Sequence, residues 1–201
     1  MKKFLTIILA AISLSFASYG ETSYTWDYVS HMEEMSIQAA SANILETNKN
    51  YTAEEADKLA RLVFFETKDS PLEFSYVLAI MKTESRFNPN ARSYCGAMGL
   101  MQIMPNTFVS VAKKNDLPYS RSDAWDIEKN IKIGVLYLES LYERYGKLDY
   151  VSAGYNGGPG TANRYIKREA GHSVSVPQQT LAYVKKVKKY HAEYKLIFGE
   201  F

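Results

Sequence analysis

One acidic side chain stands where the sequence pattern predicts an apolar one. After Pro71, the residues Val77, Ile80 and Met81 are spaced to share one face of a helix, and continuing that face toward the C-terminus reaches Glu84. A carboxyl group that loses part of its water keeps its proton to a higher pH, which suits a general acid. The alternative is a helix-end glutamate turned to solvent, because buried acids are rare. The surrounding residues must decide between the two.

Glu84 opens a series of four segments that follow one another along the chain. They are Glu-Ser-Arg-Phe-Asn-Pro at 84–89, Gly-Ala-Met-Gly-Leu-Met-Gln-Ile-Met-Pro at 96–105, Gly-Tyr-Asn-Gly-Gly-Pro-Gly at 154–160, and the Thr, Tyr, Val and Val at 180, 183, 184 and 187. In this order they resemble the lytic transglycosylases of the soluble (SLT) type, periplasmic enzymes that share the goose-type lysozyme fold. The resemblance covers about residues 51–194.

The resemblance implies a role for individual residues. Glu84 corresponds to the single catalytic acid, with Ser85 behind it, and Met101 and Gln102 correspond to groove residues that contact substrate sugars. The glycines of the segment 96–105 would let the backbone approach a bulky saccharide.

Three further residues complete the expected site. Tyr155 and Asn156 match a family motif whose tyrosine lies near the acid, and Tyr183 is similar to a tyrosine whose hydroxyl approaches the catalytic carboxylate. A tyrosine ring offers a saccharide both an apolar face and a hydroxyl group.

The reaction that the resemblance implies uses the glycan strands of peptidoglycan and no cofactor. Glu84 would protonate the oxygen between N-acetylmuramic acid and N-acetylglucosamine, then accept the proton of the muramoyl C6 hydroxyl as that oxygen attacks C1. The product is a 1,6-anhydro ring. Two alternatives stay open: a hydrolytic muramidase that uses the same acid and a water, and a glycan-binding or scaffold module of a wall-spanning apparatus.

A thiol hydrolase built on Cys95 is a further alternative. Its base would be His172 or His191, and neither lies in a recognisable partner motif. The histidines at 31, 172 and 191 share no metal-ligand spacing with one another or with Cys95, so we expect no metal site.

The charge balance argues against nucleic acid as a partner. The formal net charge of +2 comes from Lys2 and Lys3, and the rest of the chain carries 22 residues of each sign. A lysine-rich face near the C-terminus, at 185, 186, 188 and 189, could touch anionic wall or membrane surfaces, although a solvated helix face is the simpler explanation.

The first segment has the pattern of an export signal. Lys2 and Lys3 precede an apolar stretch from Phe4 to Phe16 and small residues up to Ser18, and this stretch is shorter than the ~20 residues that span a bilayer. We expect a signal peptide over 1–17, cleaved somewhere in 17–20, and an exported, periplasmic protein without a cysteine-linked lipid anchor.

The remaining pattern predicts a mainly α (α+β) fold, a lysozyme-like helical domain with at most a small β-sheet. We expect a helical extension over 21–50 and the domain itself over 51–198. Helix starts are indicated by a capping box at Thr52 and Glu55, by Ser70-Pro71, by Pro105, by Asp126 and by Pro177. Two shorter helices are expected on either side of the glycine-rich turn 157–160.

Overall fold

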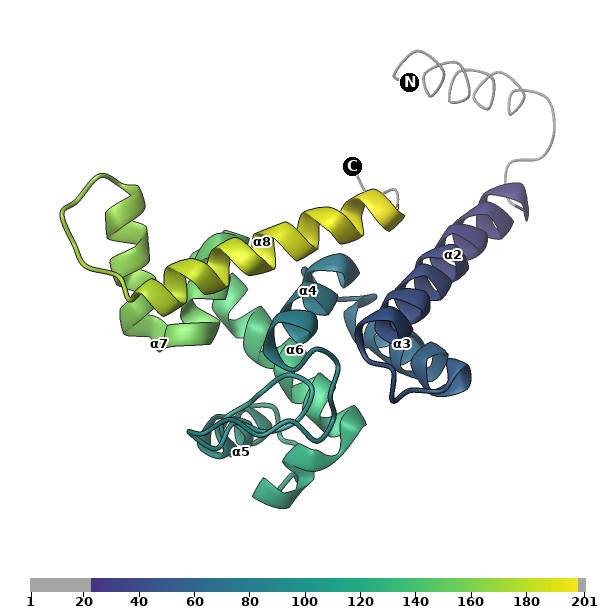
Figure 1. Cartoon of the computed structure of the whole chain (residues 1–201), viewed down its shortest axis with the longest axis horizontal. Helices are drawn as coiled ribbons and strands as arrows, with labels where there is room; N and C mark the ends of the chain where they lie inside the picture. The colour runs from purple at the N-terminus through teal and green to yellow at the C-terminus, as the bar shows by residue number, and fades with distance from the viewer. Residues whose placement is uncertain (1–22, 199–201) are drawn as a thin grey trace, which may run out of the picture. The chain divides into compact units, whose positions relative to one another are not determined.

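The computed structural model describes residues 23–198, and every regular element in that range is helical (Figure 1). The expected signal peptide at 1–17 lies outside the described residues. In place of a sheet, the described part of the chain has two isolated β-bridges, which join Arg92 to Met98 and Met98 to Ile103. The mainly α fold class is confirmed, and the small sheet is reduced to these bridges.

The first described helix, α2 (Ser23–Thr47), is divided between two compact units. Residues up to Ser36 form one unit, and Ile37–Phe201 form the other. Within the second unit, Ile37, Ala40 and Ile44 are buried in the main core. Helix α2 lies within the predicted extension over 21–50, and its part from Ile37 onward supplies core side chains to the second unit.

The second unit contains the end of α2 and all of the following elements. They are α3 (Ala53–Thr67), α4 (Phe74–Glu84), α5 (Pro105–Lys114), the 3-10 helix η1 (Arg121–Trp125), α6 (Ile127–Tyr145), α7 (Leu148–Glu169) and α8 (Gln178–Phe198).

Most of the predicted helix boundaries are confirmed by their capping interactions. Thr52 and Glu55 form the expected capping box at the start of α3. The Asp126 side chain accepts a hydrogen bond from the backbone N–H of Lys129 and caps α6. Gly146, at φ 69°, ends that helix in the left-handed conformation.

Two boundaries differ from the prediction. Ser70 and Pro71 form a turn, in which the Ser70 hydroxyl accepts from the backbone N–H of Leu72, and α4 starts only at Phe74. The predicted turn in the glycine-rich segment reduces to a single non-helical residue, Gly158, inside α7. Its φ of 75° and ψ of 173° break the helix, and Pro159 then begins the second helical part.

Helix α4 lies at the centre of the second unit. Its residues from Phe74 to Met81 are all buried, and α8 runs along it on one side while α3 packs on it from another (Figure 1). Because neighbours cover α4 on several sides, its last residue, Glu84, is partly shielded from solvent.

Candidate active site

The carboxyl group of Glu84 lies half-buried at the C-terminal end of α4. The hydroxyl of Tyr183, from α8, donates a 2.7 Å hydrogen bond to its Oε1 atom. The two residues are 99 positions apart in the chain, so this contact depends on the packing of α8 along α4.

Burial raises the pKa of Glu84 from 4.5 to about 7. The hydrogen bond from Tyr183 and the positive charge of Lys186 act in the opposite direction, because both favour the carboxylate. Burial therefore outweighs both, and the carboxyl group holds its proton close to neutral pH, as a general acid requires.

Two buried tyrosines flank this carboxyl group. Burial raises the pKa of Tyr183 and of Tyr155 well above 10, and the neighbouring Glu84 charge adds to both shifts. Both phenols therefore stay protonated. Tyr155, from α7, donates a 2.7 Å hydrogen bond to the backbone carbonyl of Met101, and its ring packs against Tyr137 with centroids 5.3 Å apart.

The loop from Ala97 to Ile103 is held by a buried asparagine. Asn130, on α6, accepts from the backbone N–H of Met101 at 2.9 Å and donates to the carbonyls of Met98 and Ala124. Gly99 leaves the room for it, since a Cβ at Gly99 would lie 2.5 Å from the Asn130 amide nitrogen. The asparagine thus fixes the loop that accepts the Tyr155 hydroxyl.

Met101 has a different place from the one expected. Its side chain is 0% exposed and fills space beside Gly134, where a Cβ would come within 2.7 Å of it. We therefore assign the side chain of Met101 to the core. Only its backbone carbonyl reaches the site, where it accepts the hydrogen bond from Tyr155.

Gln102 and Ser85 are engaged with the protein backbone. The Gln102 amide donates to the carbonyls of Ala91 and Gly99 at 2.8 and 2.9 Å, and its own backbone has a φ of 47°. The Ser85 hydroxyl donates to the carbonyl of Met81 at the end of α4. Ser85 therefore braces the end of α4, and Gln102 braces the loop from Ala91 to Gly99. Contact of Gln102 with sugars stays a proposal, through its side-chain carbonyl oxygen.

Asn156 is tied to the start of α8. The hydroxyl of the buried Thr180 donates a 3.0 Å hydrogen bond to the Asn156 side-chain oxygen. This bond joins the segment that carries Tyr155 to the helix that carries Tyr183.

Sequence reasoning did not assign Asn130 to the site, although a signal exists. Asn130 shares a helix face with Gly134, Leu138 and Leu141, all buried, so it is a polar residue on an apolar stripe, as Glu84 is. Lys186 was noted only as part of a charged face, and the pattern of its own helix does not show that it lies near Glu84.

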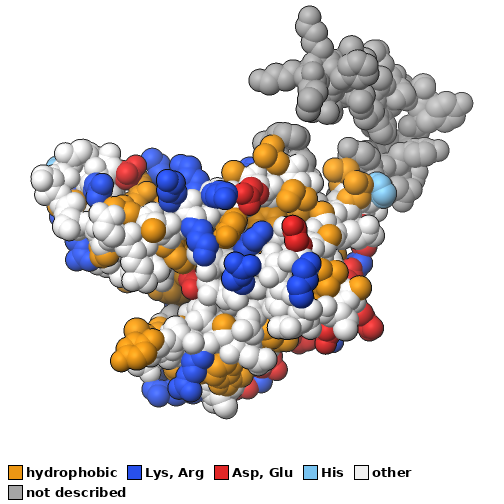
Figure 2. All heavy atoms as spheres, viewed as in Figure 1, with side chains coloured by type: hydrophobic (Ala, Val, Ile, Leu, Met, Phe, Trp, Pro, Cys, Tyr) orange, Lys and Arg blue, Asp and Glu red, His pale blue; other side chains and the backbone are white. Residues whose placement is uncertain are grey.

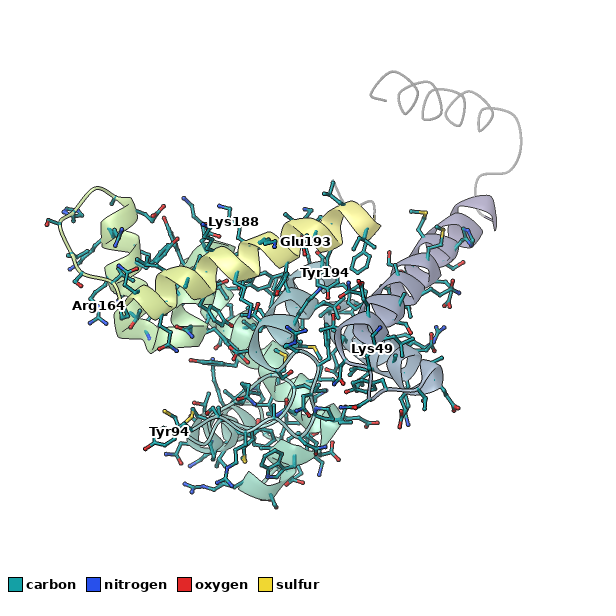
Figure 3. The ribbon with its side chains drawn as sticks, in the orientation of Figure 1. Lys49, Tyr94, Arg164, Lys188, Glu193 and Tyr194 are labelled. Atoms are coloured by element: carbon teal, nitrogen blue, oxygen red, sulfur yellow. The ribbon has the colours of Figure 1, made fainter. Side chains whose placement is uncertain are left out.

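The surface is hollowed between two of the parts that carry these residues (Figure 2). Figure 2 shows the hollow between the part that carries α7 and α8 and the loop that precedes α5. In Figure 3, Tyr94 marks the loop side and Arg164 marks the α7 side. Tyr94 is fully exposed at the tip of its loop.

Of the two candidate bases for a thiol site, His191 is engaged elsewhere. Cys95 is exposed in the loop beside Tyr94, whereas His191, on α8, lies 2.6 Å from a carboxylate oxygen of Glu73 and packs against Tyr76. Glu73 precedes α4 and Glu84 ends it, so His191 lies at the opposite end of this helix from the acid.

Residues 23–198 hold neither a metal site nor a membrane-spanning helix. Within residues 23–198, no group of three or more His, Cys, Asp or Glu side chains is placed to hold a metal ion. In the same range, none of the helices combines the length and the apolar character needed to cross a membrane.

A helical domain in which a tyrosine holds one acid of raised pKa has the features of a general-acid site. The comparison with known families is more specific. The Transglycosylase SLT domain profile matches residues 61–175, and the chain belongs to this family.

Similar proteins include the soluble lytic murein transglycosylase of Escherichia coli K12, which is 35% identical over 196 residues, 92% of this chain and 29% of that protein. The membrane-bound lytic murein transglycosylase C of Edwardsiella ictaluri is 36% identical over 141 residues, 65% of this chain and 39% of that protein. The chain thus spans less than a third of the length of the soluble relative.

Solved structures show the same fold. The 70 kDa soluble lytic transglycosylase of Escherichia coli superposes with a TM-score of 0.64 and 31% identity, covering 82% of this chain and 29% of that one. The same 70 kDa enzyme has also been solved in complex with bulgecin A. An inactive mutant of the lytic transglycosylase Slt of Pseudomonas aeruginosa, in which glutamine replaces a glutamate, superposes with a TM-score of 0.61 and 29% identity, covering 68% and 24% of the two chains.

Proposed function

We propose that this chain is a peptidoglycan lytic transglycosylase, which cleaves the bond between N-acetylmuramic acid and N-acetylglucosamine without consuming water. The observation that carries the proposal is the carboxyl group of Glu84, whose burial raises its pKa to about 7 while Tyr183 holds it in place. The known relatives are named for this activity.

Glu84 acts twice in this proposal. As a carboxylic acid it donates its proton to the glycosidic oxygen, and the bond from that oxygen to C1 of the muramoyl residue breaks. As a carboxylate it accepts the proton of the C6 hydroxyl while O6 bonds to C1. Glu84 thus donates one proton and accepts one proton. The 1,6-anhydro product forms, and Glu84 is again a carboxylic acid. A pKa of about 7 lets one group serve both steps near neutral pH.

The surroundings of Glu84 support a single-acid mechanism. Glycosidases that use two carboxylates hold them about 5–5.5 Å apart for retention, or further apart for inversion. The groups that shift the pKa of Glu84 besides its burial are Tyr183 and Lys186, neither of them an acid. We propose that the N-acetyl group of the substrate stabilises the positive charge at C1 in place of a second carboxylate.

The other residues have supporting roles in the proposal. Tyr183 orients the acid, Tyr155 and Asn130 fix the loop at Met101, and Thr180 holds Asn156 at the wall of the site. Neither a metal nor another cofactor enters the mechanism.

The place of action follows from the substrate. We propose an exported, periplasmic protein, since peptidoglycan lies outside the cytoplasm and the first segment has the pattern of an export signal.

The lysine face of α8 is a second, weaker contact with the wall. Lys185, Lys186, Lys188 and Lys189 are all exposed, and blue side chains gather on this part of the surface in Figure 2. Lys188 and Lys189 already pair with Asp149 and Glu193. We propose that the positive charge of Lys185 and Lys186 gives only a weak attraction to the wall, which salt screens. Co-sedimentation with insoluble peptidoglycan should therefore decrease as the sodium chloride concentration rises.

The decisive experiment is mass spectrometry of the muropeptides released from purified peptidoglycan by the protein, by Glu84→Gln and by the control Glu143→Gln, an exposed glutamate of α6. Products one water lighter than hydrolytic muropeptides, from the protein and the control but not from Glu84→Gln, support the proposal. Reducing-end products would instead identify a muramidase. Glycan binding without any product would identify a binding module.

A further inference from the structure

The chain makes a strained turn directly after Glu84. The backbone N–H of Asn88 donates to the carbonyl of Ser85 at 3.1 Å, which closes a four-residue turn. Its two central residues, Arg86 and Phe87, both have left-handed backbones, with φ of 53° and 61°. Such a pair normally calls for Asn and Gly, because other side chains are strained there. A turn of this kind needs outside contacts to persist.

One of these contacts is the ring of Phe87, which is 0% exposed in the main core. The ring fixes the position of the side chain. Burial of the ring alone does not satisfy the backbone carbonyl of the same residue, which needs a hydrogen-bond partner. That carbonyl has its own partner.

The partner is Asn48, just after the end of α2. Its side-chain nitrogen donates to the Phe87 carbonyl at 3.1 Å, across 39 positions of sequence. Its side-chain oxygen accepts from the backbone N–H of Asn50 at 3.1 Å, which sets the orientation of the amide. Asn48 thus presents its N–H group to the turn in a fixed direction.

The space behind the turn makes this bond more important. Asn48, Asn88, Pro89 and Asn90 line one side of a cavity of about 560 Å³, whose other walls come from α3 and the start of α6. Open space therefore lies beside residues 88–90, where the chain leaves the turn. On that side the turn has fewer packing contacts than the buried ring of Phe87 has in the core.

We infer that Asn48 is a positioning residue for Glu84: by holding the Phe87 carbonyl, it keeps the strained turn in place and the acid against Tyr183. The inference rests on the proposed role of Glu84. Because Asn48 directly follows α2, the end of this helix would stabilise the position of the acid through the turn at 85–88.

The pKa of Glu84 is set by the groups that face it, so it reports whether a loss of Asn48 moves the carboxyl group. They are Tyr183 and Lys186 from α8 and Tyr155 from α7. If the turn relaxes, Glu84 moves away from these groups toward solvent, and its pKa falls from about 7 toward its ordinary value of 4.5.

The test compares Asn48→Ala and Asn48→Asp with the control Asn50→Ala. Asp keeps the oxygen that accepts from Asn50 but lacks the N–H group that reaches Phe87. Asn50 lines the same cavity, and only its backbone takes part in the bond to Asn48. The pKa of the Glu84 carboxyl group is measured by NMR titration, with Glu84→Gln for assignment, and kcat and KM are measured on peptidoglycan well below each melting temperature.

We expect both Asn48 variants to lower the pKa of Glu84, to move the alkaline limb of the pH profile to lower pH, and to reduce kcat roughly ten- to hundredfold with a smaller change in KM. Asn50→Ala should match the parent protein. If the Asn48 variants melt earlier but keep the pKa and kcat, Asn48 is only structural and the inference is wrong. If the parent protein shows no turnover, the proposed activity fails, and the pKa comparison still decides whether Asn48 positions the carboxyl group.

Discussion

The Tyr183 hydroxyl lies 2.7 Å from Oε1 of Glu84, and this contact connects the last helix of the domain to the central one. It has two opposing consequences. The ring of Tyr183 helps to exclude water, which raises the pKa of Glu84, whereas its hydroxyl favours the charged carboxylate and lowers that pKa. The balance of the two is a carboxyl group that exchanges its proton near neutral pH.

Glu84→Gln should remove activity and yet stabilise the fold at alkaline pH. The folded protein holds the Glu84 proton up to about pH 7, whereas the unfolded chain releases it near 4.5, so stability is lost as the pH rises through this window. Gln carries no charge and avoids that loss. We expect a gain on the order of 1–3 kcal/mol at pH 8 and none at pH 4, from thermal melts at both values. An equal or lower melting temperature of the variant at pH 8 would contradict the buried-acid assignment.

Tyr183→Phe should move the alkaline limb of the activity profile to higher pH. The variant keeps the ring that excludes water but loses the hydroxyl that stabilises the carboxylate, so the pKa of Glu84 rises further. We also expect kcat to fall, by up to about a hundredfold, because the acid loses its orienting partner. The comparison variant is Tyr165→Phe, a buried tyrosine in the smaller core cluster, which should leave the pH profile unchanged. A shift toward acidic pH in Tyr183→Phe would refute this account.

Lys186→Gln should also raise the pKa of Glu84, by less than Tyr183→Phe does. The positive charge of Lys186 favours the carboxylate, and it is the smaller of the two opposing contributions. Its neighbour Lys185 is equally exposed and does not contribute to this shift, so Lys185→Gln is a matched control. The pH profile of kcat, measured at low and at high salt, should show the difference between the two variants shrinking as salt screens the charge. Identical profiles at low salt would exclude a role for Lys186.

Gly99→Ala should destabilise the protein much more than Gly96→Ala. Both glycines have a positive φ, 76° and 88°, so alanine is strained by about 1–2 kcal/mol at either position. At Gly99 the new Cβ would also lie 2.5 Å from the Asn130 amide, whereas nothing lies within 4 Å at Gly96. Displacing Asn130 breaks its bonds to the loop, so we expect a total loss above about 3 kcal/mol for Gly99→Ala, from urea unfolding. Equal losses in the two variants would show that Asn130 does not support the loop.

The sequence predicts the helix that ends at Glu84 and the acid on its apolar face, because both depend on local spacing. The start of the same helix was misplaced, since Ser70-Pro71 is also a common turn signal and the Ser70 hydroxyl serves the turn. Met101 was expected to contact sugars, but its side chain packs into the core beside Gly134. Local spacing does not show which helix covers a given side chain.

The sequence by itself determined the boundaries of α3 and α6, because capping residues and glycines act on their immediate neighbours, and it marked Glu84 as an acid on an apolar face. Only the tertiary structure decided how that acid behaves. The pKa of Glu84 depends on the water that α7 and α8 exclude, and the turn behind it depends on Asn48, which lies 36 positions earlier in the chain. Desolvation and long-range hydrogen bonds are properties of neighbours in space, so a pattern read along the chain does not contain them.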